Sequence, residues 1–325
     1  MKILINNPAF EGLVPKTPKY ALKNTPLNRS IKAKEIFFSK KKQKKFYFFE
    51  NNKKKKFFLK KVRVNQYPSL MFLREITDFL LKKKINTPKI NKFSKDIRDK
   101  NIFFIWFDYV NGKYLKAEKM DIILLAKNLS FLHKNLKKFN KQDLILKKTI
   151  KRMEDLEMIR SKYIKDTKKF KNFLCYKKIK SLLIEFGDIN RFYKNLIKFS
   201  QCTHGDLVPG NVIKNHKKLF FLDLEDTSYS FYPVIFDIGL ILERLVLINK
   251  KLKKKDKVKL IKTFFDNYKY PSKNKLNLDF KKVIKFLSIR SLLTEIKKFY
   301  HYENYSKKEL NKFLKLYQKN YFFLK

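Results

Sequence analysis

Short apolar runs separated by polar segments predict an antiparallel sheet in the first third of the chain. Three aromatic runs, at residues 36–38, 46–49 and 57–59, are divided by segments rich in lysine and asparagine. Aromatic residues favour strands, and polar segments of this kind favour the turns between them. A helix follows over about residues 67–84, and a turn and a fourth strand come next. The apolar run 102–112 predicts a fifth strand.

The pattern becomes helical towards the C-terminus. Residues 140–200 are mostly charged and amphipathic, and the chain from 254 onward is also expected to be helical. We therefore expect an α+β protein with an irregular lead-in at 1–34, a β-rich domain at 35–111 and a helical domain at 112–325. The first helix of this domain has apolar residues at intervals of three and four: Ile122, Ile123, Ala126, Leu129, Leu132 and Leu136.

Composition changes this picture little, although the formal charge of +50 is extreme. Only nine of the 79 basic residues are arginines, and the lysines are spread along the chain, as an A+T-rich coding sequence would produce. We expect no specific nucleic-acid partner, while peripheral contact with anionic lipid stays open. Cys175 and Cys202 suggest neither a disulfide framework nor a metal site. No apolar run is long enough to span a membrane, so a cytoplasmic protein is expected.

The candidate chemistry lies in a polar cluster, His204 to Asn211, and in the apolar run from Phe220 that ends at Asp223 and Glu225. Asn211 follows Asp206 by five positions, and Asp223 follows Asn211 by twelve. A kinase catalytic loop has this spacing. The transition state of phosphoryl transfer carries charge on phosphate oxygens, and Mg²⁺ prefers oxygen ligands.

The spacing therefore assigns one role to each of three side chains. Asp206 would accept, or at least orient, the proton of the attacking hydroxyl. The amide oxygen of Asn211 and the carboxylate of Asp223 would hold Mg²⁺. An ordinary aspartate-rich turn explains any one of these residues, but it does not explain the joint pattern.

With these motifs the chain resembles the aminoglycoside phosphotransferase and choline kinase superfamily over about residues 35–300. The resemblance implies a bilobal, protein-kinase-like fold with a β-rich N-lobe and a helical C-lobe. It also implies that ATP and Mg²⁺ are used to phosphorylate a hydroxyl of a small molecule. Acceptors in the family include aminoglycosides, choline, ethanolamine, homoserine and sugars, and the leading expectation here is an amino alcohol or a sugar.

The resemblance also implies nucleotide-binding residues in the N-terminal domain. Lys60, with Lys61 as the alternate, would reach the phosphates and pair with Glu75 on the following helix. Alternation along the strand favours Lys60. The backbone near Asp108, Tyr109 and Val110 would pair with adenine. The loop expected over the phosphates, Ser39 to Lys45, contains no glycine, which departs from the family pattern.

Supporting roles are expected for residues around the loop. Asp237 would fix the loop through hydrogen bonds to its backbone, and His204 would have a similar framing role. His133 is expected to be structural, and Glu225 would either assist a second metal ion or cap the turn. The competing class is a non-catalytic basic module, binding nucleic acid or anionic lipid on a kinase-like scaffold.

Overall fold

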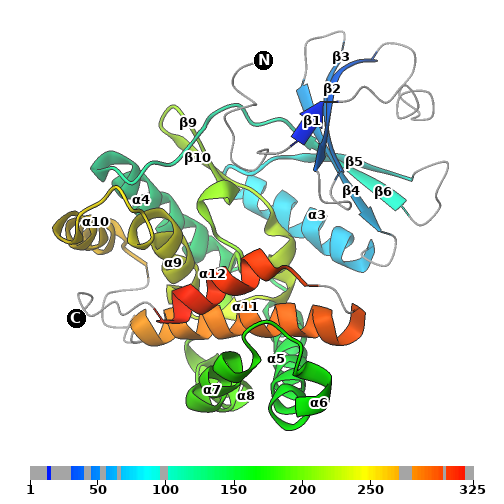
Figure 1. Cartoon of the computed structure of the whole chain (residues 1–325). Helices are drawn as coiled ribbons and strands as arrows, with labels where there is room; N and C mark the ends of the chain where they lie inside the picture. Colours follow the sequence, from blue (N-terminus) through cyan, green and yellow to red (C-terminus); the bar gives the residue numbers. More distant parts are fainter. Residues whose placement is uncertain are drawn as a thin grey trace. The chain divides into compact units, whose positions relative to one another are not determined.

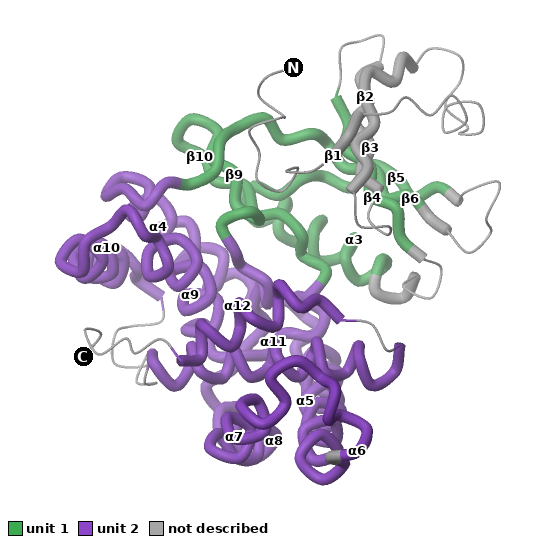
Figure 2. The backbone as a smooth tube through the Cα atoms, in the orientation of Figure 1, with its two compact units in different colours: residues 1–115, 209–225 green, residues 116–208, 226–325 purple. Residues whose placement is uncertain are grey.

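The structure of the chain, a computed structural model, describes residues 13–15, 31–39, 45–51, 56–63, 67–95, 102–270, 280–302 and 305–318 (Figure 1). The chain divides into two compact units (Figure 2). Unit 1 comprises residues 1–115 and 209–225, and unit 2 comprises residues 116–208 and 226–325. Segment 209–225, which the sequence pattern grouped with the C-terminal domain, is therefore part of the sheet-rich unit.

Unit 1 contains a six-stranded antiparallel sheet with the strand order β1-β2-β3-β4-β6-β5. Consecutive pairing of β2, β3 and β4 gives the meander that the aromatic runs predicted. Residues 40–44, most of the predicted lysine-rich loop, lie outside the described residues. The strands are β1 (Leu13–Pro15), β2 (Ile31–Ser39), β3 (Lys45–Asn51), β4 (Lys56–Arg63), β5 (Ile90–Lys95) and β6 (Ile102–Asp108).

Helix α3 (Tyr67–Lys82) connects β4 to β5 and is amphipathic. Leu73, Ile76 and Leu80 are buried, whereas Glu75 is exposed. Because residues three, four and seven apart share one face of a helix, the buried positions form one continuous apolar stripe. This stripe fixes the rotation of α3 about its axis and keeps Glu75 on the solvent side.

A second sheet of unit 1 joins segments that are distant in sequence. It has the order β10-β9-β7, from β7 (Lys113–Tyr114), β9 (Val212–Asn215) and β10 (Lys218–Phe221). Gly112 precedes β7, and a Cβ atom at this position would collide with the carbonyl of Lys214. Glycine therefore permits the close approach of the two backbones that brings segment 209–225 into unit 1.

Unit 2 is mainly helical, with one short antiparallel pair formed by β8 (Gln201–Cys202) and β11 (Phe231–Tyr232). Its core helix is α11 (Phe280–Tyr302), in which eleven residues are buried. The other helices are α4 (Lys119–Leu136), α5 (Gln142–Lys165), α6 (Thr167–Phe170), α7 (Tyr176–Phe186), α8 (Ile189–Lys194), α9 (Ile235–Leu242), the π-helix η6 (Glu243–Leu247), α10 (Lys254–Asn267) and α12 (Lys307–Gln318).

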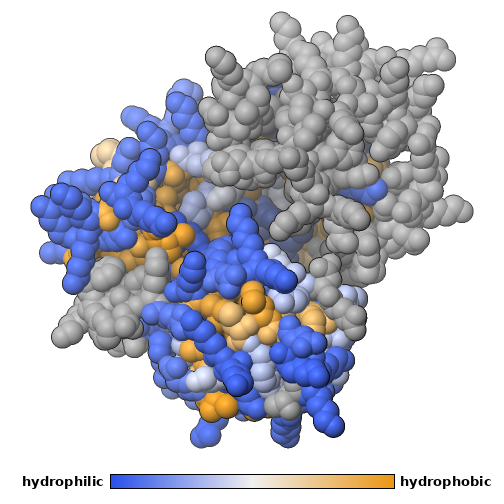
Figure 3. Space-filling view, viewed as in Figure 1, coloured by the Kyte–Doolittle hydropathy of each residue, from blue (hydrophilic) through white to orange (hydrophobic). Residues whose placement is uncertain are grey.

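On the face seen in Figure 3, hydrophilic residues cover much of the described part of unit 2, with hydrophobic areas between them. The helices agree with the sequence periodicity, including the one predicted from Met120 onward. Within the described part of the chain, no helix combines the length and the apolar character needed to cross a membrane.

Candidate active site

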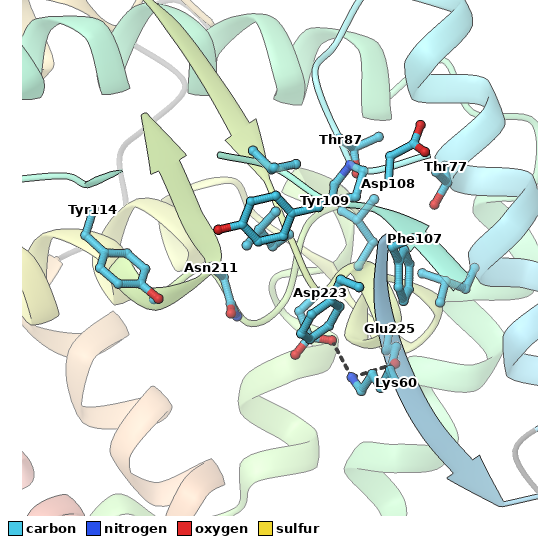
Figure 4. Close-up of a pocket in the computed structure, with 17 residues that line it drawn as sticks. Lys60, Thr77, Thr87, Phe107, Asp108, Tyr109, Tyr114, Asn211, Asp223 and Glu225 are labelled. Atoms are coloured by element: carbon cyan, nitrogen blue, oxygen red, sulfur yellow. Dashed lines mark hydrogen bonds and ion pairs between the residues drawn. The ribbon is translucent and has the colours of Figure 1, made fainter. Parts of the chain in front are cut away.

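A pocket of about 350 Å³ lies entirely within unit 1 (Figure 4). This volume is within the usual range for small-molecule sites. Its lining includes every predicted nucleotide-binding or metal-binding residue of the unit except Glu75. Those lining residues are Lys60, Asp108, Tyr109, Val110, Asn211, Asp223 and Glu225.

Strand β4 presents Lys60 to this pocket. Phe58 and Lys60 both line it, whereas Leu59 is buried and Lys61 is not part of the lining. Side chains alternate between the two faces of a strand, so Phe58 and Lys60 share one face. Of the two lysines that the sequence left open, Lys60 is the one that lines the pocket.

Two carboxylates hold the ammonium group of Lys60. Its Nζ lies 2.7 Å from Oε1 of Glu225 and 3.0 Å from Oδ1 of Asp223. Burial acts to lower the pKa of Lys60, but the charges of Asp223 and Glu225 and the hydrogen bonds to them outweigh it and raise the pKa above its ordinary value. Lys60 is therefore a fixed cation at the polar end of the pocket.

The predicted partner of Lys60 was Glu75, and the structure places these residues differently. Glu75 lies on the exposed side of α3, outside the pocket lining. The ion pairs of Lys60 go instead to the segment after β10. The physical reason is the buried stripe of α3, which includes Ile76, the residue that follows Glu75.

Asn211 and Asp223 reach the pocket from two ends of the β9-β10 hairpin. Asn211 ends the turn η4 (Pro209–Asn211), and Asp223 follows β10. The N–H of Leu222 donates to the carbonyl of Asn211 at 2.8 Å, which ties the two ends together. Asp223 has a φ of 56°, in the left-handed region that aspartate tolerates better than most residues.

The donor set here fits a hard divalent cation. Carboxylate and amide oxygens are the ligands that Mg²⁺ takes, and it usually binds one or two carboxylates together with phosphate oxygens and water. Asp223 and Asn211 offer such oxygens on one pocket wall (Figure 4). Over the residues that the structure describes, no cluster of three or more His, Cys, Asp or Glu forms a closed metal site.

The opposite end of the pocket suits an aromatic base. Its lining includes Phe107, Tyr109 and Val110, and the side chains of Asp108, Thr77 and Thr87 lie on this side in Figure 4. Asn91 donates to the carboxylate of Asp108 at 2.9 Å. Trp106 is buried and donates to Ser94, so it packs in the core and is not part of the pocket lining.

Backbone hydrogen bonds narrow the adenine-binding prediction to fewer atoms. The N–H of Asp108 donates to the carbonyl of Lys89 at 2.9 Å, and the N–H of Tyr109 donates to the carbonyl of Lys56 at 3.1 Å. Both amides are therefore engaged within the sheet. Among the three residues predicted at this position, the amide of Val110 is the best candidate to donate to a base.

In unit 2, the carboxylate of Asp237 holds the backbone of the polar loop. Its Oδ2 accepts the N–H of His204 at 2.7 Å, and its Oδ1 accepts the N–H of Gly205 at 2.9 Å. Nε2 of His133 lies 3.0 Å from Oδ2, and Nδ1 lies 2.7 Å from the hydroxyl of Tyr268. A carboxylate only accepts, so Nε2 donates and, in a neutral ring, Nδ1 accepts from the hydroxyl.

This network is buried and shifts the pKa of Asp237. Burial acts to raise the pKa, but His133, His204 and the N–H of Gly205 outweigh it and hold the pKa below its ordinary value. His133 and His204 are also fully buried. The carboxylate thus serves as an internal acceptor for the loop that carries Asp206, and Asp206 itself is only half-buried.

Gly205 is needed for the path of this loop. Its φ is 84°, and a Cβ atom there would collide with the hydroxyl of Ser230. Both the backbone conformation and the close contact therefore exclude other residues. The glycine in the sequence motif has a structural cause.

Sequence reasoning missed a buried arginine beside the loop. Arg290 on α11 is 7% exposed, donates to the carbonyl of Gly205 at 3.3 Å and lies over the ring of Tyr232. Burial acts to lower the pKa of Arg290, but Tyr232, Asp226 and Asp206 raise it above its ordinary value. The available signal was an arginine within an apolar helical segment of a chain in which arginine is scarce.

The pocket, the loop and the fold agree with a known class of protein. Residues 42–251 match the model of the phosphotransferase enzyme family, which is more than half of the chain. The chain therefore belongs to this family, and the resemblance inferred from the motifs is confirmed. No curated protein matches the sequence significantly.

Solved structures similar to this chain include small-molecule kinases. An amicoumacin kinase, hAmiN, aligns with a TM-score of 0.60 and 13% identity over 89% of this chain and 92% of that chain. The aminoglycoside phosphotransferase APH(3'')-Id from Streptomyces rimosus gives 0.55 and 13% over 90% and 96%. An ethanolamine kinase from Plasmodium vivax gives 0.54 and 14% over 96% and 82%. The expected protein-kinase-like fold is therefore confirmed.

Proposed function

We propose that the protein is an ATP-dependent, Mg²⁺-requiring phosphotransferase whose acceptor is a hydroxyl group of a small molecule. The observation that carries this proposal is that Lys60, Asn211 and Asp223 line one pocket of unit 1. Family membership supports the same reaction class. The comparisons give no support to a non-catalytic basic binding module.

In this proposal each end of the pocket has a separate task. Phe107, Tyr109 and Val110 bind the base, with the amide of Val110 as a hydrogen-bond donor. Lys60 binds phosphate oxygens as a point charge. Asn211 and Asp223 provide oxygen ligands for the cation. When bound, Mg²⁺ neutralises charge that develops on the phosphates during transfer.

Asp206 acts as the general base that deprotonates the acceptor hydroxyl. Its carboxylate takes the proton of the acceptor hydroxyl as the new P–O bond forms, and the bond between the γ-phosphoryl group and ADP breaks. Asp237 and His204 keep the loop backbone in place, and Arg290 holds the carbonyl of Gly205. Glu225 does not need to touch the acceptor in this scheme.

The acceptor is proposed to be an amino alcohol or a sugar. The motif spelling from Leu207 to Asn211 and from Asp223 to Glu225 supports this choice, because it is similar to bacterial choline kinases. Structural neighbours include an ethanolamine kinase and a choline kinase, LicA from Streptococcus pneumoniae. A panel of amino alcohols, sugars and aminoglycosides, screened for ADP release, identifies the acceptor.

The deciding variant is Asp206→Ala. We expect ADP release with the identified acceptor to fall by about 10²–10⁴-fold, the usual contribution of a general base, while the protein stays folded. Asp143→Ala is the matched control, because Asp143 is exposed in the first turn of α5. Unchanged turnover in Asp206→Ala, with the control also unchanged, contradicts the proposed function.

A further inference from the structure

The polar end of the pocket contains one more carboxylate than the proposed reaction uses. Lys60 contacts both Asp223 and Glu225, and the contact with Glu225 is the shorter of the two. Only Asp223 has a role as a metal ligand in the proposed function. The contact between Lys60 and Glu225 therefore needs a separate explanation.

We propose that Glu225 is the positioning residue of Lys60 and takes the role that the sequence assigned to Glu75. The lysine is then held by a residue of η5 (Leu224–Tyr229), which follows β10, rather than by helix α3. This inference rests on the proposed function for its catalytic consequence, but the anchoring of Lys60 can be measured without any nucleotide.

The first argument is the geometry around Glu225. It lies in η5 (Leu224–Tyr229) directly after Leu224, which is 2% exposed. Just before Leu224, the N–H of Leu222 donates to the carbonyl of Asn211 and so holds this end of the hairpin. Because Leu224 is buried and the two ends of the hairpin are joined by this hydrogen bond, the backbone that carries Glu225 is held in place. Its carboxylate therefore stays close to Lys60. The side chains of Lys60 and Glu225 are 14% and 32% exposed, so the ion pair is partly shielded from water.

The second argument is the position of Glu75. Successive residues of a helix are about 100° apart around its axis. Turning α3 far enough to direct Glu75 inward would rotate Ile76, which is 0% exposed, away from the interior. Leu73 and Leu80 would leave the interior with it. The apolar stripe therefore opposes the pairing of Glu75 with Lys60.

The third argument is the balance of charges. Two carboxylates facing one ammonium leave one negative charge in excess. If Asp223 is a ligand of a divalent cation, Lys60 loses part of its contact with that residue. Glu225 still pairs with Lys60, so the lysine remains in place when the cation binds.

The first experiment measures the anchoring of Lys60 directly, in the full chain without nucleotide. The protein is treated with an amine-reactive acylating reagent, and modification of Lys60 is quantified by peptide mass spectrometry with Lys61 as the internal reference. We expect Glu225→Gln to increase labelling of Lys60 several-fold. Glu75→Gln, the matched control, is expected to leave labelling unchanged. Equal labelling of Lys60 in Glu225→Gln and in the protein without substitutions would overturn the inference.

The second experiment measures nucleotide affinity by calorimetric titration with a non-hydrolysable ATP analogue, in EDTA and then in Mg²⁺. In the titration, we expect Glu225→Gln to weaken binding about tenfold in EDTA and to add little to the effect of Lys60→Met. In the separate ADP-release assay with ATP and Mg²⁺, we expect Glu225→Gln to raise the KM for ATP more than it lowers kcat. Glu75→Gln is expected to change affinity less than twofold.

Other results in the titration overturn the inference in distinct ways. Unchanged affinity of Glu225→Gln in EDTA, with a higher Mg²⁺ requirement, would make Glu225 a metal ligand instead. An equal loss in Glu75→Gln would return the role to α3. If the protein without substitutions binds no nucleotide, the proposed function fails. The labelling experiment still decides in that case whether Glu225 anchors Lys60.

Discussion

Two aspartates, one in each unit, illustrate two uses of a carboxylate. The side chain of Asp223 in unit 1 is 38% exposed and pairs with the ammonium of Lys60. The side chain of Asp237 in unit 2 is 2% exposed and binds two backbone amides and the ring of His133. A partly exposed carboxylate whose partner is a lysine ammonium can exchange that partner for a metal ion. A buried carboxylate that satisfies backbone donors cannot be released without cost, so its role is to hold the loop.

The comparison predicts that the largest loss of stability follows the removal of Asp237. We expect Asp237→Ala to lower the free energy of unfolding by about 3–5 kcal/mol, because buried donors on His133, His204 and Gly205 lose their acceptor. Urea denaturation followed by circular dichroism measures the change. Asp143→Ala on the exposed face of α5 should cost less than about 1 kcal/mol. A loss for Asp237→Ala no larger than that of Asp143→Ala would contradict the structural role.

In contrast to Asp237→Ala, the substitution Asp223→Asn should lower activity strongly and stability only slightly. Asparagine also tolerates a left-handed backbone, so the variant removes charge with little added strain. We expect phosphotransfer to fall at least about a hundredfold, comparable to removal of one charge-stabilising group from an active site, and unfolding free energy to change by less than about 1 kcal/mol. Steady-state ADP release and urea denaturation measure both quantities. Full activity of Asp223→Asn would eliminate this aspartate as the metal ligand.

A smaller effect is expected at the outer end of the Asp237 network. Tyr268→Phe removes the hydroxyl that lies 2.7 Å from Nδ1 of His133. Loss of one buried hydrogen bond should reduce the unfolding free energy by about 1 kcal/mol, with little change in turnover. Thermal denaturation and the ADP-release assay test this together. A large loss of turnover without loss of stability would assign the hydroxyl to the chemistry instead.

The smallest expected effect is on the pH dependence of stability. The pKa of Asp237 is lowered in the folded protein, so its contribution to stability is fully present above the ordinary aspartate pKa of 3.8 and is lost as pH falls through the folded value. The free energy of unfolding of the unmodified protein should therefore decline more steeply below about pH 4 than that of Asp237→Asn. Denaturation midpoints between neutral and acidic pH measure the two slopes. Parallel slopes would show that Asp237 makes no such contribution.

The sequence predicted those features that depend on local pattern. The meander, the helix at α3 and the helical C-terminal segments follow from apolar periodicity over short windows. Strand alternation favoured Lys60 over Lys61, and the pocket lining agrees with that choice. The spacing of Asn211 and Asp223 sufficed to predict that they would lie close together, because a single hairpin connects them.

Contacts between distant segments were harder to predict. Lys60 and Glu225 are far apart in sequence, and no local pattern indicates which of the chain's acidic residues meets a given lysine. A general kinase pattern favoured Glu75, whereas the rotation of α3 is fixed by its own buried stripe. Arg290 was missed because its contact with Gly205 depends on tertiary packing of α11.

The left-handed backbone at Asp223 bears on how this position would change over evolutionary time. A residue with a side chain costs about 1 kcal/mol there relative to glycine, which adopts the same conformation without steric penalty. Neutral drift in a lineage that no longer needed the reaction would therefore favour glycine. Under the proposed function the carboxylate has to be kept despite this conformational cost, so a survey of related sequences for glycine at this position would distinguish active lineages from lapsed ones.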